Sequence, residues 1–174
     1  MSIGMVHVYC GDGKGKTTAA MGLALRCAGN GGKVYIYQFL KNGSSGECSV
    51  LNGIEGVTMA EGFQSAKFVW NMNEEEKAEA AAYYKNKFRE ITALVRDGYD
   101  MLILDELMAA VGYDFVPIGE VLSFLKSKPD GLEVVMTGRN PDERLIEAAD
   151  YVSEIRKIKH PYDKGIQARK GIEF

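Results

Sequence analysis

Several features that mark specialised proteins are scarce or missing in this sequence. Its 174 residues contain only three cysteines, at positions 10, 27 and 48, and no Cys-x-x-Cys pair. An odd number at this spacing argues against a disulfide framework and against a zinc site built from cysteines. The three thiols are therefore expected to be buried or incidental side chains in a reducing compartment.

Long apolar runs and an excess of one charge sign are also absent. No window of about 18 apolar residues occurs, and the first five residues carry no basic leader. We therefore expect neither a membrane span nor secretion, and we predict a cytoplasmic protein. The 21 basic and 24 acidic side chains leave a net charge of −3. This balance gives no electrostatic footprint for nucleic acid or for an anionic membrane.

What remains is the composition of an ordinary folded protein. Hydrophobic residues make up 46% of the chain and charged residues 26%, which is typical of a globular fold and excludes a disordered chain. The sequence shows no internal repeat and no low-complexity linker. Its length favours one domain spanning residues 1–174.

Apolar strand patterns alternate with helical patterns along the chain. Strands are expected at residues 5–10, 34–40, 56–59, 101–104, 133–137 and 151–158. Helices are expected at residues 17–27, 73–98, from 117 onward and 140–149. The longest helix has Asn73 as its N-cap, with Glu76 completing a capping box. This alternation predicts an α/β fold, a three-layer sandwich around a mostly parallel sheet of about five to six strands.

A glycine-rich turn stands where the first strand leads into the first helix. It consists of Gly11, Asp12, Gly13, Lys14, Gly15, Lys16, Thr17 and Thr18. Backbone N–H groups in such a turn bind phosphate oxygens, Lys16 contacts phosphate, and the Thr17 hydroxyl ligates Mg²⁺ or Mn²⁺. Cys10 occupies the place of the usual first glycine, so the loop is a variant. We predict a nucleotide-binding fold of the P-loop NTPase, RecA-like type.

An acidic pair follows the strand at residues 101–104. Asp105 and Glu106 stand at its carboxyl end, which a parallel sheet places at the same edge as the glycine-rich turn. We expect Asp105 to hold the metal ion, usually through water, and Glu106 to align a water, bind the ribose or also touch the metal. The candidate metal ligands are Thr17, Asp105 and Glu106, and the candidate catalytic residues are Lys16, Thr17 and Glu106.

Motifs spread over nearly the whole chain are shared with one family. They lie at residues 11–20, 38–41, 62–63 with 70, 104–107, 137–139 and 159–163, and also at 150–154 and 165–173. In this order they resemble the P-loop ATP:corrinoid adenosyltransferases. The resemblance implies an enzyme that transfers the 5′-deoxyadenosyl group from ATP to the Co(I) of a corrinoid, cobalamin or cobinamide. Triphosphate is released, in adenosylcobalamin synthesis or salvage.

The resemblance also implies roles for individual residues. Lys14 and Lys41 would assist at the triphosphate, which is expected to lie in the loop with its polarity reversed relative to kinases. Phe63, Phe68 and Trp70 would line the corrinoid side, where flat apolar groups exclude water from cobalt. Plain core packing is the alternative for each of these aromatic side chains.

Two further residues and two partners belong to this expectation. Arg139 follows a strand at the ligand-binding edge and would bind phosphate or the corrin amides, with a surface ion pair as the alternative. His160 is expected to be a solvated surface residue rather than a cobalt ligand. The family resemblance further implies a homodimer and a flavodoxin-type reductant.

Two other functions remain open at this point. A phosphoryl-transferring ATPase or kinase would use Glu106 to polarise water and would release ADP. A non-catalytic module would bind ATP and hand a corrinoid to a partner without turnover. A thymidine-kinase-like protein is disfavoured, because the three cysteines cannot supply its zinc cluster.

Overall fold

Six parallel strands form one sheet in the part of the chain that the structure describes. The computed structural model describes residues 3–41, 46–63 and 69–172. The strands are β1 (Val6–Cys10), β2 (Val34–Gln38), β3 (Val57–Met59), β4 (Met101–Asp105), β5 (Glu133–Thr137) and β6 (Tyr151–Glu154). Their order across the sheet is β3-β2-β4-β5-β1-β6, and every neighbouring pair is parallel. The prediction of a mostly parallel sheet is confirmed.

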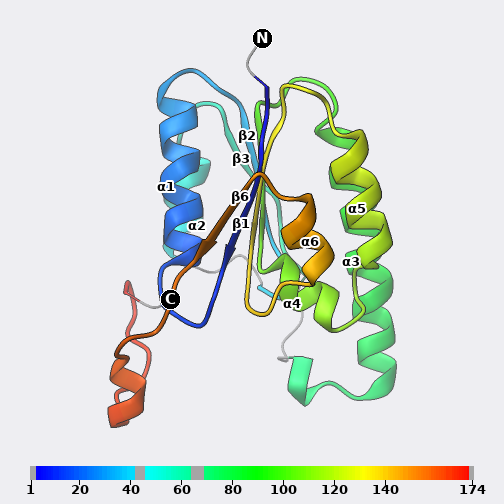
Figure 1. The fold of residues 1–174 in the computed structure, drawn as a ribbon. Helices are drawn as coiled ribbons and strands as arrows, with labels where there is room; N and C mark the ends of the chain where they lie inside the picture. Colours follow the sequence, from blue (N-terminus) through cyan, green and yellow to red (C-terminus); the bar gives the residue numbers. More distant parts are fainter. Residues whose placement is uncertain (1–2, 42–45, 64–68, 173–174) are drawn as a thin grey trace.

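Helices cover both faces of this sheet. The α-helices are α1 (Lys16–Gly29), α2 (Gly46–Asn52), α3 (Glu74–Leu94), α4 (Leu107–Gly112), α5 (Ile118–Ser127) and α6 (Glu143–Ala148). Two 3₁₀ helices are η1 (Val69–Asn71) and η2 (Pro161–Lys164). Figure 1 shows α1 and α2 on one side of the sheet and α3 to α6 on the other. The predicted three-layer α/β sandwich is therefore confirmed.

Apolar side chains on both faces of the strands explain the layers. Strand β4 is buried along its whole length. Leu102 and Leu104 belong to the same core cluster as Phe88 of α3, whereas Ile103 belongs to the cluster that contains Ala20 of α1. Continuous apolar runs of this kind are typical of parallel strands covered on both faces.

The strand order brings the two predicted halves of the site to one edge. Strand β5 lies between β1 and β4, so the glycine-rich loop after β1 and the acidic pair after β4 begin two strands apart. In Figure 1 the carboxyl ends of the strands point to the lower end of the molecule. Ligands of open α/β sheets bind at this edge.

The predicted capping box is present at the start of α3. The Asn73 side chain accepts a hydrogen bond from the Glu76 N–H at 2.9 Å, and the Glu76 carboxylate accepts one from the Asn73 N–H at 2.9 Å. The helix ends at Leu94 rather than at Gly98, because the C-cap Val95 leaves the helical conformation with a ψ of 2°.

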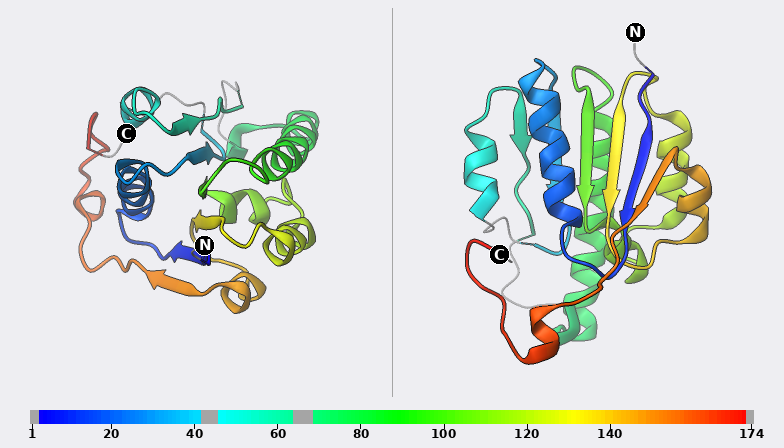
Figure 2. Two further views of the ribbon diagram at one scale, coloured as in Figure 1. Left: turned by 90° about the horizontal axis from the view of Figure 1, so that it is seen from above. Right: turned by 60° about the vertical axis from the view of Figure 1, so that its left-hand side comes forward.

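The last predicted strand is shorter than expected. It ends at Glu154 instead of Ile158, because the next residue contacts the glycine-rich loop: the Ile155 carbonyl accepts a hydrogen bond from the Gly13 N–H. Strand β6 is one of the two outer strands of the described sheet, next to β1, and all its residues are exposed. Figure 2 shows the chain continuing from β6 past the end of β1.

The strand predicted at residues 34–40 ends at Gln38, because the chain turns there and Leu40 has a left-handed φ of 57°. Short helices account for other differences. Helix α6 begins at Glu143 rather than at Asn140, because the Asp142 carboxylate caps the Arg144 N–H. The sequence did not predict α2 and α4, which have 7 and 6 residues and are too short to show a clear helical period. Within the described ranges, no helix is both long and apolar enough to cross a bilayer.

Candidate active site

The glycine-rich loop folds around the side chain of Lys16. Its ammonium group donates hydrogen bonds to the carbonyl oxygens of Gly11 and Gly13, both at 2.8 Å. The side chain is buried, with the residue only 7% exposed. A buried ammonium at the centre of a backbone loop is suited to binding an anion that takes the place of these carbonyl contacts.

The first turn of α1 adds backbone donors to this loop. Gly15 is the N-cap in the left-handed conformation, with φ of 118°, and no side chain caps the helix. The first N–H groups of a helix have no partner within the helix, and the helix dipole favours negative charge beside them. The loop and the helix start together therefore present N–H groups and an ammonium group to phosphate.

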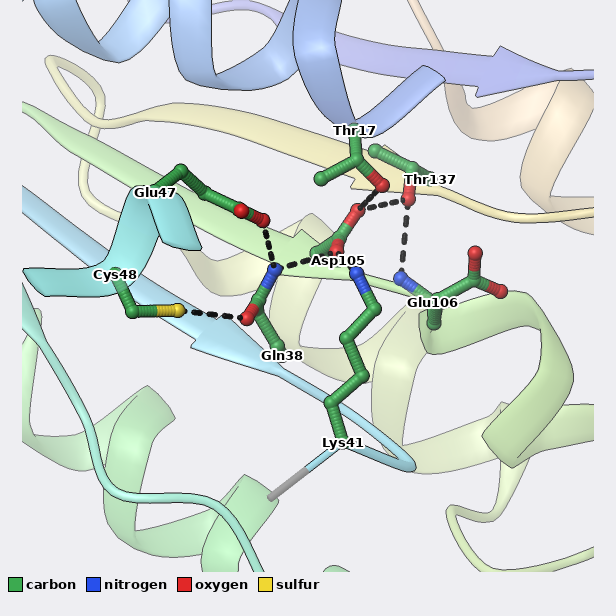
Figure 3. Close-up of polar contacts among 8 residues, drawn as sticks. All are labelled: Thr17, Gln38, Lys41, Glu47, Cys48, Asp105, Glu106 and Thr137. Carbon is green, nitrogen blue, oxygen red and sulfur yellow. Dashed lines mark hydrogen bonds and ion pairs between the residues drawn. The ribbon is translucent and has the colours of Figure 1, made fainter. Parts of the chain in front are cut away.

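Asp105 is the centre of the polar network at this edge (Figure 3). Its Oδ1 accepts hydrogen bonds from the hydroxyl groups of Thr17 at 2.8 Å and Thr137 at 2.7 Å. Its Oδ2 accepts from the Gln38 amide and the Lys41 ammonium group, both at 3.0 Å. The residue is fully buried. Burial of a carboxylate is costly unless it is paired and hydrogen-bonded, and both conditions are met.

Lys41 reaches this carboxylate because of an unusual turn at the end of β2. Leu40 has a φ of 57°, a left-handed conformation that costs a residue with a side chain on the order of 1–2 kcal/mol. The Lys41 side chain is 31% exposed, whereas the Asp105 side chain has no exposure. The ammonium group therefore brings a positive charge from the solvent side to a buried carboxylate.

Glu106 also adopts the left-handed conformation, with φ of 59°. Its backbone N–H donates to the Thr137 hydroxyl at 3.0 Å, and Figure 3 shows its carboxylate directed away from Asp105. Burial and the neighbouring Asp105 raise the pKa of the Glu106 carboxyl, while Lys41 and Lys16 oppose that shift. Backbone strain and a raised pKa together are typical of functional positions.

The positive groups of the site also influence one another. Burial, and then the charge of Arg139, lower the pKa of Lys16, whereas Glu106 opposes this effect. Arg139 itself is exposed, and it follows Gly138, which has a φ of 148°. A Cβ on Gly138 would lie 2.7 Å from the Met108 Cβ, so the backbone at Gly138 packs closely against α4. This close packing fixes the position of the backbone from which the Arg139 side chain extends.

The remaining predicted residues are distributed unevenly around this centre. Lys14 and Thr18 are exposed beside Lys16 and Thr17. The carboxylate of Asp12 accepts a hydrogen bond from the Lys157 N–H at 2.9 Å, so it faces the C-terminal segment. The structure thus brings together Lys16, Thr17, Asp105 and Lys41, with Glu106 and Arg139 near enough to affect the same charges.

The structure describes two of the three predicted aromatic residues, and these two differ in exposure. Phe63 is half-buried, and its ring centre lies 4.7 Å from that of Tyr83 and 5.6 Å from that of Tyr84. It therefore packs against the core cluster beside α3. Trp70, on η1, is 71% exposed. Phe68 lies outside the described residues.

Sequence reasoning did not select four residues of the Asp105 network. Gln38 and Thr137 end strands β2 and β5, and a polar residue ending an apolar strand at the ligand-binding edge is a signal that could have found them. On α2, the Cys48 thiol donates to the side-chain Oε1 of Gln38 at 3.2 Å, and the Glu47 carboxylate accepts from the Gln38 side-chain Nε2 at 3.5 Å. These two contacts had no sequence signal, because α2 itself was not predicted.

The oxygen atoms at this centre fit a divalent cation that also binds phosphate. Among the described residues no group of three or more His, Cys, Asp or Glu side chains could hold a metal ion alone. Mg²⁺ uses one or two protein oxygens together with phosphate and water, and hydroxyl and carboxylate oxygens are its preferred ligands. Thr17 and Asp105 supply such a pair, and the Lys41 ammonium group already marks the carboxylate as a place for positive charge.

The parallel sheet, the loop around Lys16 and the Thr17–Asp105 pair define a P-loop nucleotide-binding protein. Comparison with known proteins narrows this class. The model of the family "ATP:corrinoid adenosyltransferase BtuR/CobO/CobP" matches residues 2–174, and the chain belongs to this family.

Individual relatives agree with this assignment. The corrinoid adenosyltransferase of Escherichia coli (strain K12) is 38% identical over 175 residues, covering 98% of this chain and 86% of that protein. The corrinoid adenosyltransferase CobA of Salmonella typhimurium is 38% identical with the same coverage. That of Pseudomonas aeruginosa is 35% identical, covering 98% of this chain and 84% of the relative.

One solved structure supports the fold alone. The cytoplasmic domain of EssC superposes with a TM-score of 0.50 at 16% sequence identity, covering 96% of this chain. This chain spans 35% of that solved chain.

Proposed function

We propose that this protein is an ATP:corrinoid adenosyltransferase whose one domain, residues 1–174, transfers the 5′-deoxyadenosyl group of ATP to the Co(I) of a corrinoid. The observation that carries this proposal is the family match over residues 2–174. The loop around Lys16 and the acidic residues at the carboxyl end of β4 fit the binding of a nucleoside triphosphate. Cobalamin and cobinamide are the proposed acceptors.

The reaction needs an in-line arrangement more than it needs a base. The electron pair of Co(I) forms the bond to the 5′ carbon, the bond from that carbon to oxygen breaks, and its electrons leave with the triphosphate. Cobalt is thereby oxidised to Co(III), and no proton has to be moved. The protein must therefore hold ATP in position and stabilise the negative charge that gathers on the leaving group.

The phosphate loop is the proposed binding site for the triphosphate. Lys16 would exchange its contacts with two loop carbonyl groups for phosphate oxygens, and the N–H groups from Lys14 to Thr18 would donate to the same group. Arg139, just after β5, and Lys41, just after β2, would add positive charge beside the triphosphate. Glu106 would bind the ribose or align the metal-bound water.

A magnesium ion, or manganese in its place, is the proposed metal cofactor. Thr17 and Asp105 would hold it, because the hydroxyl and the carboxylate already lie 2.8 Å apart and hard cations prefer oxygen ligands. When bound, such an ion neutralises charge on the phosphate oxygens. Lys41 would then move its charge from Asp105 toward the triphosphate.

The corrinoid would approach from the carboxyl edge beside η1 and α3. The exposed ring of Trp70 supports this assignment for one aromatic residue, whereas the packing of Phe63 against Tyr83 favours a supporting role beneath the surface. Phe68 keeps its place in the proposal from the sequence alone.

Partners and location complete the proposal. A homodimer is supported by the outer strand β6, where Tyr151 is 54% and Val152 is 46% exposed. A flavodoxin-type reductant would be attracted by the segment 155–172, which carries six basic residues (Arg156, Lys157, Lys159, Lys164, Arg169 and Lys170) and one acidic residue (Asp163). We propose that the enzyme works in the cytoplasm.

The deciding experiment is an anaerobic incubation of the full chain with MgATP and chemically reduced cob(I)alamin. Corrinoid and phosphate products are analysed separately. Light-sensitive adenosylcobalamin together with triphosphate is the expected result, and a Lys16→Ala variant should lose both products. ADP and phosphate with an unchanged corrinoid would overturn the proposal and indicate a phosphohydrolase or kinase. Tight ATP binding with no product would instead indicate a non-catalytic binding module.

A further inference from the structure

The phosphate loop is attached to a segment that lies almost at the other end of the chain. The Ile155 N–H donates to the Cys10 carbonyl at 2.8 Å, and the Gly13 N–H donates to the Ile155 carbonyl at 2.7 Å. The Lys157 N–H donates to Asp12 Oδ1 at 2.9 Å, across 145 residues of sequence. These bonds continue the contact of β6 with β1 beyond the ends of both strands and into the loop.

The same segment explains two of the loop's glycines. A Cβ on Gly11 would lie 2.4 Å from the Ile155 carbonyl oxygen, and one on Gly13 would lie 2.7 Å from that atom. Nothing lies within 4 Å of the position of a Cβ on Gly15. Gly13 is therefore required by contact with protein backbone, Gly11 by that contact and by its positive φ of 100°, and Gly15 by its left-handed φ of 118° alone.

The hydrogen bonds between the loop and residues 155–157 also determine which polar groups of the loop remain free to bind a ligand. The Gly13 N–H is already used by Ile155, so donors to phosphate begin at Lys14. The Asp12 carboxylate accepts from a backbone N–H on the C-terminal side. This bond lowers the pKa of the Asp12 carboxyl, so the group is ionised and remains an acceptor at neutral pH. A carboxylate that turned inward would instead repel a triphosphate.

We propose that Asp12 is a positioning residue that clamps the phosphate loop to residues 155–157 and does not itself bind the nucleotide. The clamp holds the N–H groups from Lys14 to Thr18 in the shape that receives phosphate. The inference rests on the proposed function only in taking ATP as the ligand. The sequence predicts Asp12 as part of the nucleotide-binding turn, and the clamp gives it a supporting role in that turn instead of a direct contact.

The first test compares two substitutions at this position. Asp12→Asn keeps an oxygen that can accept the Lys157 N–H, whereas Asp12→Ala removes it. The dissociation constant for MgATP is measured by calorimetry on the full chain without corrinoid. We expect Asp12→Asn to stay within about twofold of the wild type and Asp12→Ala to bind about tenfold more weakly, roughly the value of one ordinary hydrogen bond.

The second test removes the donor instead of the acceptor. Lys157→Pro has no N–H, while Lys157→Ala keeps the N–H and removes only the side chain. We expect the proline variant to weaken MgATP binding about as much as Asp12→Ala, and the alanine variant to bind like the wild type. The double variant Asp12→Ala/Lys157→Pro should be no weaker than either single one, because both remove the same bond.

Two results would overturn the inference. If Asp12→Asn bound as weakly as Asp12→Ala, the carboxylate charge would act on the nucleotide or the metal directly. If Asp12→Ala and Lys157→Pro both bound MgATP like the wild type, the clamp would have no influence on the loop. Both results come from MgATP binding without corrinoid. A failure of the proposed function would instead appear as ADP among the reaction products, so the two failures can be told apart.

Discussion

The Thr17 hydroxyl and Asp105 Oδ1 lie 2.8 Å apart, although 88 residues separate them in the sequence. This bond joins the first turn of α1 to the carboxyl end of β4. The two oxygen atoms are close enough to share a single cation, so a metal ion would replace a hydrogen bond that the protein already makes.

The first prediction concerns Thr17 and Mg²⁺. Thr17→Ser keeps the hydroxyl and should leave the magnesium requirement nearly unchanged. Thr17→Val keeps the shape without the oxygen, and we expect the Mg²⁺ concentration for half-maximal adenosylation to rise about tenfold. Titration of activity with Mg²⁺ at saturating ATP measures this. Equal magnesium curves for the two variants would contradict a metal-binding role of the hydroxyl.

The second prediction concerns the positive charge inside the loop. Lys16→Ala should lower kcat/KM for adenosylation by roughly 100-fold or more, the usual effect of removing a group that stabilises charge in the transition state. Lys14→Ala removes an exposed charge of the same loop and should cost about tenfold or less, since exposed charges interact weakly. Product formation from cob(I)alamin at varied ATP measures both, and equal losses would argue against a special role of Lys16.

The third prediction concerns the buried carboxylate. Asp105→Asn removes the charge that Lys41 and Gln38 contact, and we expect the free energy of unfolding to fall by about 2 kcal/mol. Adding Lys41→Met should recover part of this loss, because the ammonium group then no longer lies beside a neutral amide. Urea denaturation is measured for Asp105→Asn, for Lys41→Met and for the double variant. If the two single losses of unfolding free energy simply added up in the double variant, the ion pair would contribute nothing to stability.

The fourth prediction is a pH dependence of stability. Burial and Asp105 raise the pKa of Glu106 above its ordinary value. Folding then favours the protonated carboxyl, so its stabilising contribution is full below the unfolded pKa of 4.5 and is lost as pH rises through the folded value. Glu106→Gln should therefore be more stable than the wild type at pH 7, with an advantage that shrinks toward pH 4. Urea denaturation across this range measures it.

Glu120 provides a control of opposite sign. Its hydrogen bonds to Arg89 lower the pKa of the Glu120 carboxyl, so its contribution is present above the unfolded value and lost as pH falls. Glu120→Gln should therefore be less stable than the wild type at pH 7 and should match it in acid. The interpretation of Glu106 would fail if both glutamine variants changed stability in the same direction.

The fifth prediction concerns the glycine before Arg139. Gly138→Ala should destabilise the fold by about 2 kcal/mol or more, because a Cβ would meet Met108 at 2.7 Å and the φ of 148° is strained for alanine. Gly22→Ala, in the middle of α1 with nothing within 4 Å, should instead stabilise it by about 0.5–1 kcal/mol. Thermal unfolding of both variants gives the comparison.

Local rules explain why most of the fold could be predicted. The inner strands β4 and β5 are mainly apolar runs, and the capping box at Asn73 and Glu76 is a signal that acts within four residues. The short helices α2 and α4 are set instead by the elements that they pack on. The end of β6 also depends on distant residues, since contact with the loop at Gly13 replaces strand pairing there.

The candidate site divides in the same way. The loop and the acidic pair are visible in the sequence, because each is a short motif at the end of an apolar strand. Two partners of Asp105, Gln38 and Thr137, were not selected, since their contact with it also depends on the order of β2, β4 and β5 in the sheet. The left-handed turns at Leu40 and Glu106 also escape sequence rules, because neither residue type favours that conformation.

The contact between Asp12 and Lys157 also has a consequence for how the protein is made. The ribosome synthesises the glycine-rich loop first and adds Lys157, which binds Asp12, 145 residues later. At roughly 5–20 residues per second, synthesis of these 145 residues takes about 7–29 s. During that time the growing chain carries the motif without its support. If the clamp is needed to bind phosphate, the loop gains its ability to capture ATP only after residues 155–157 have been synthesised.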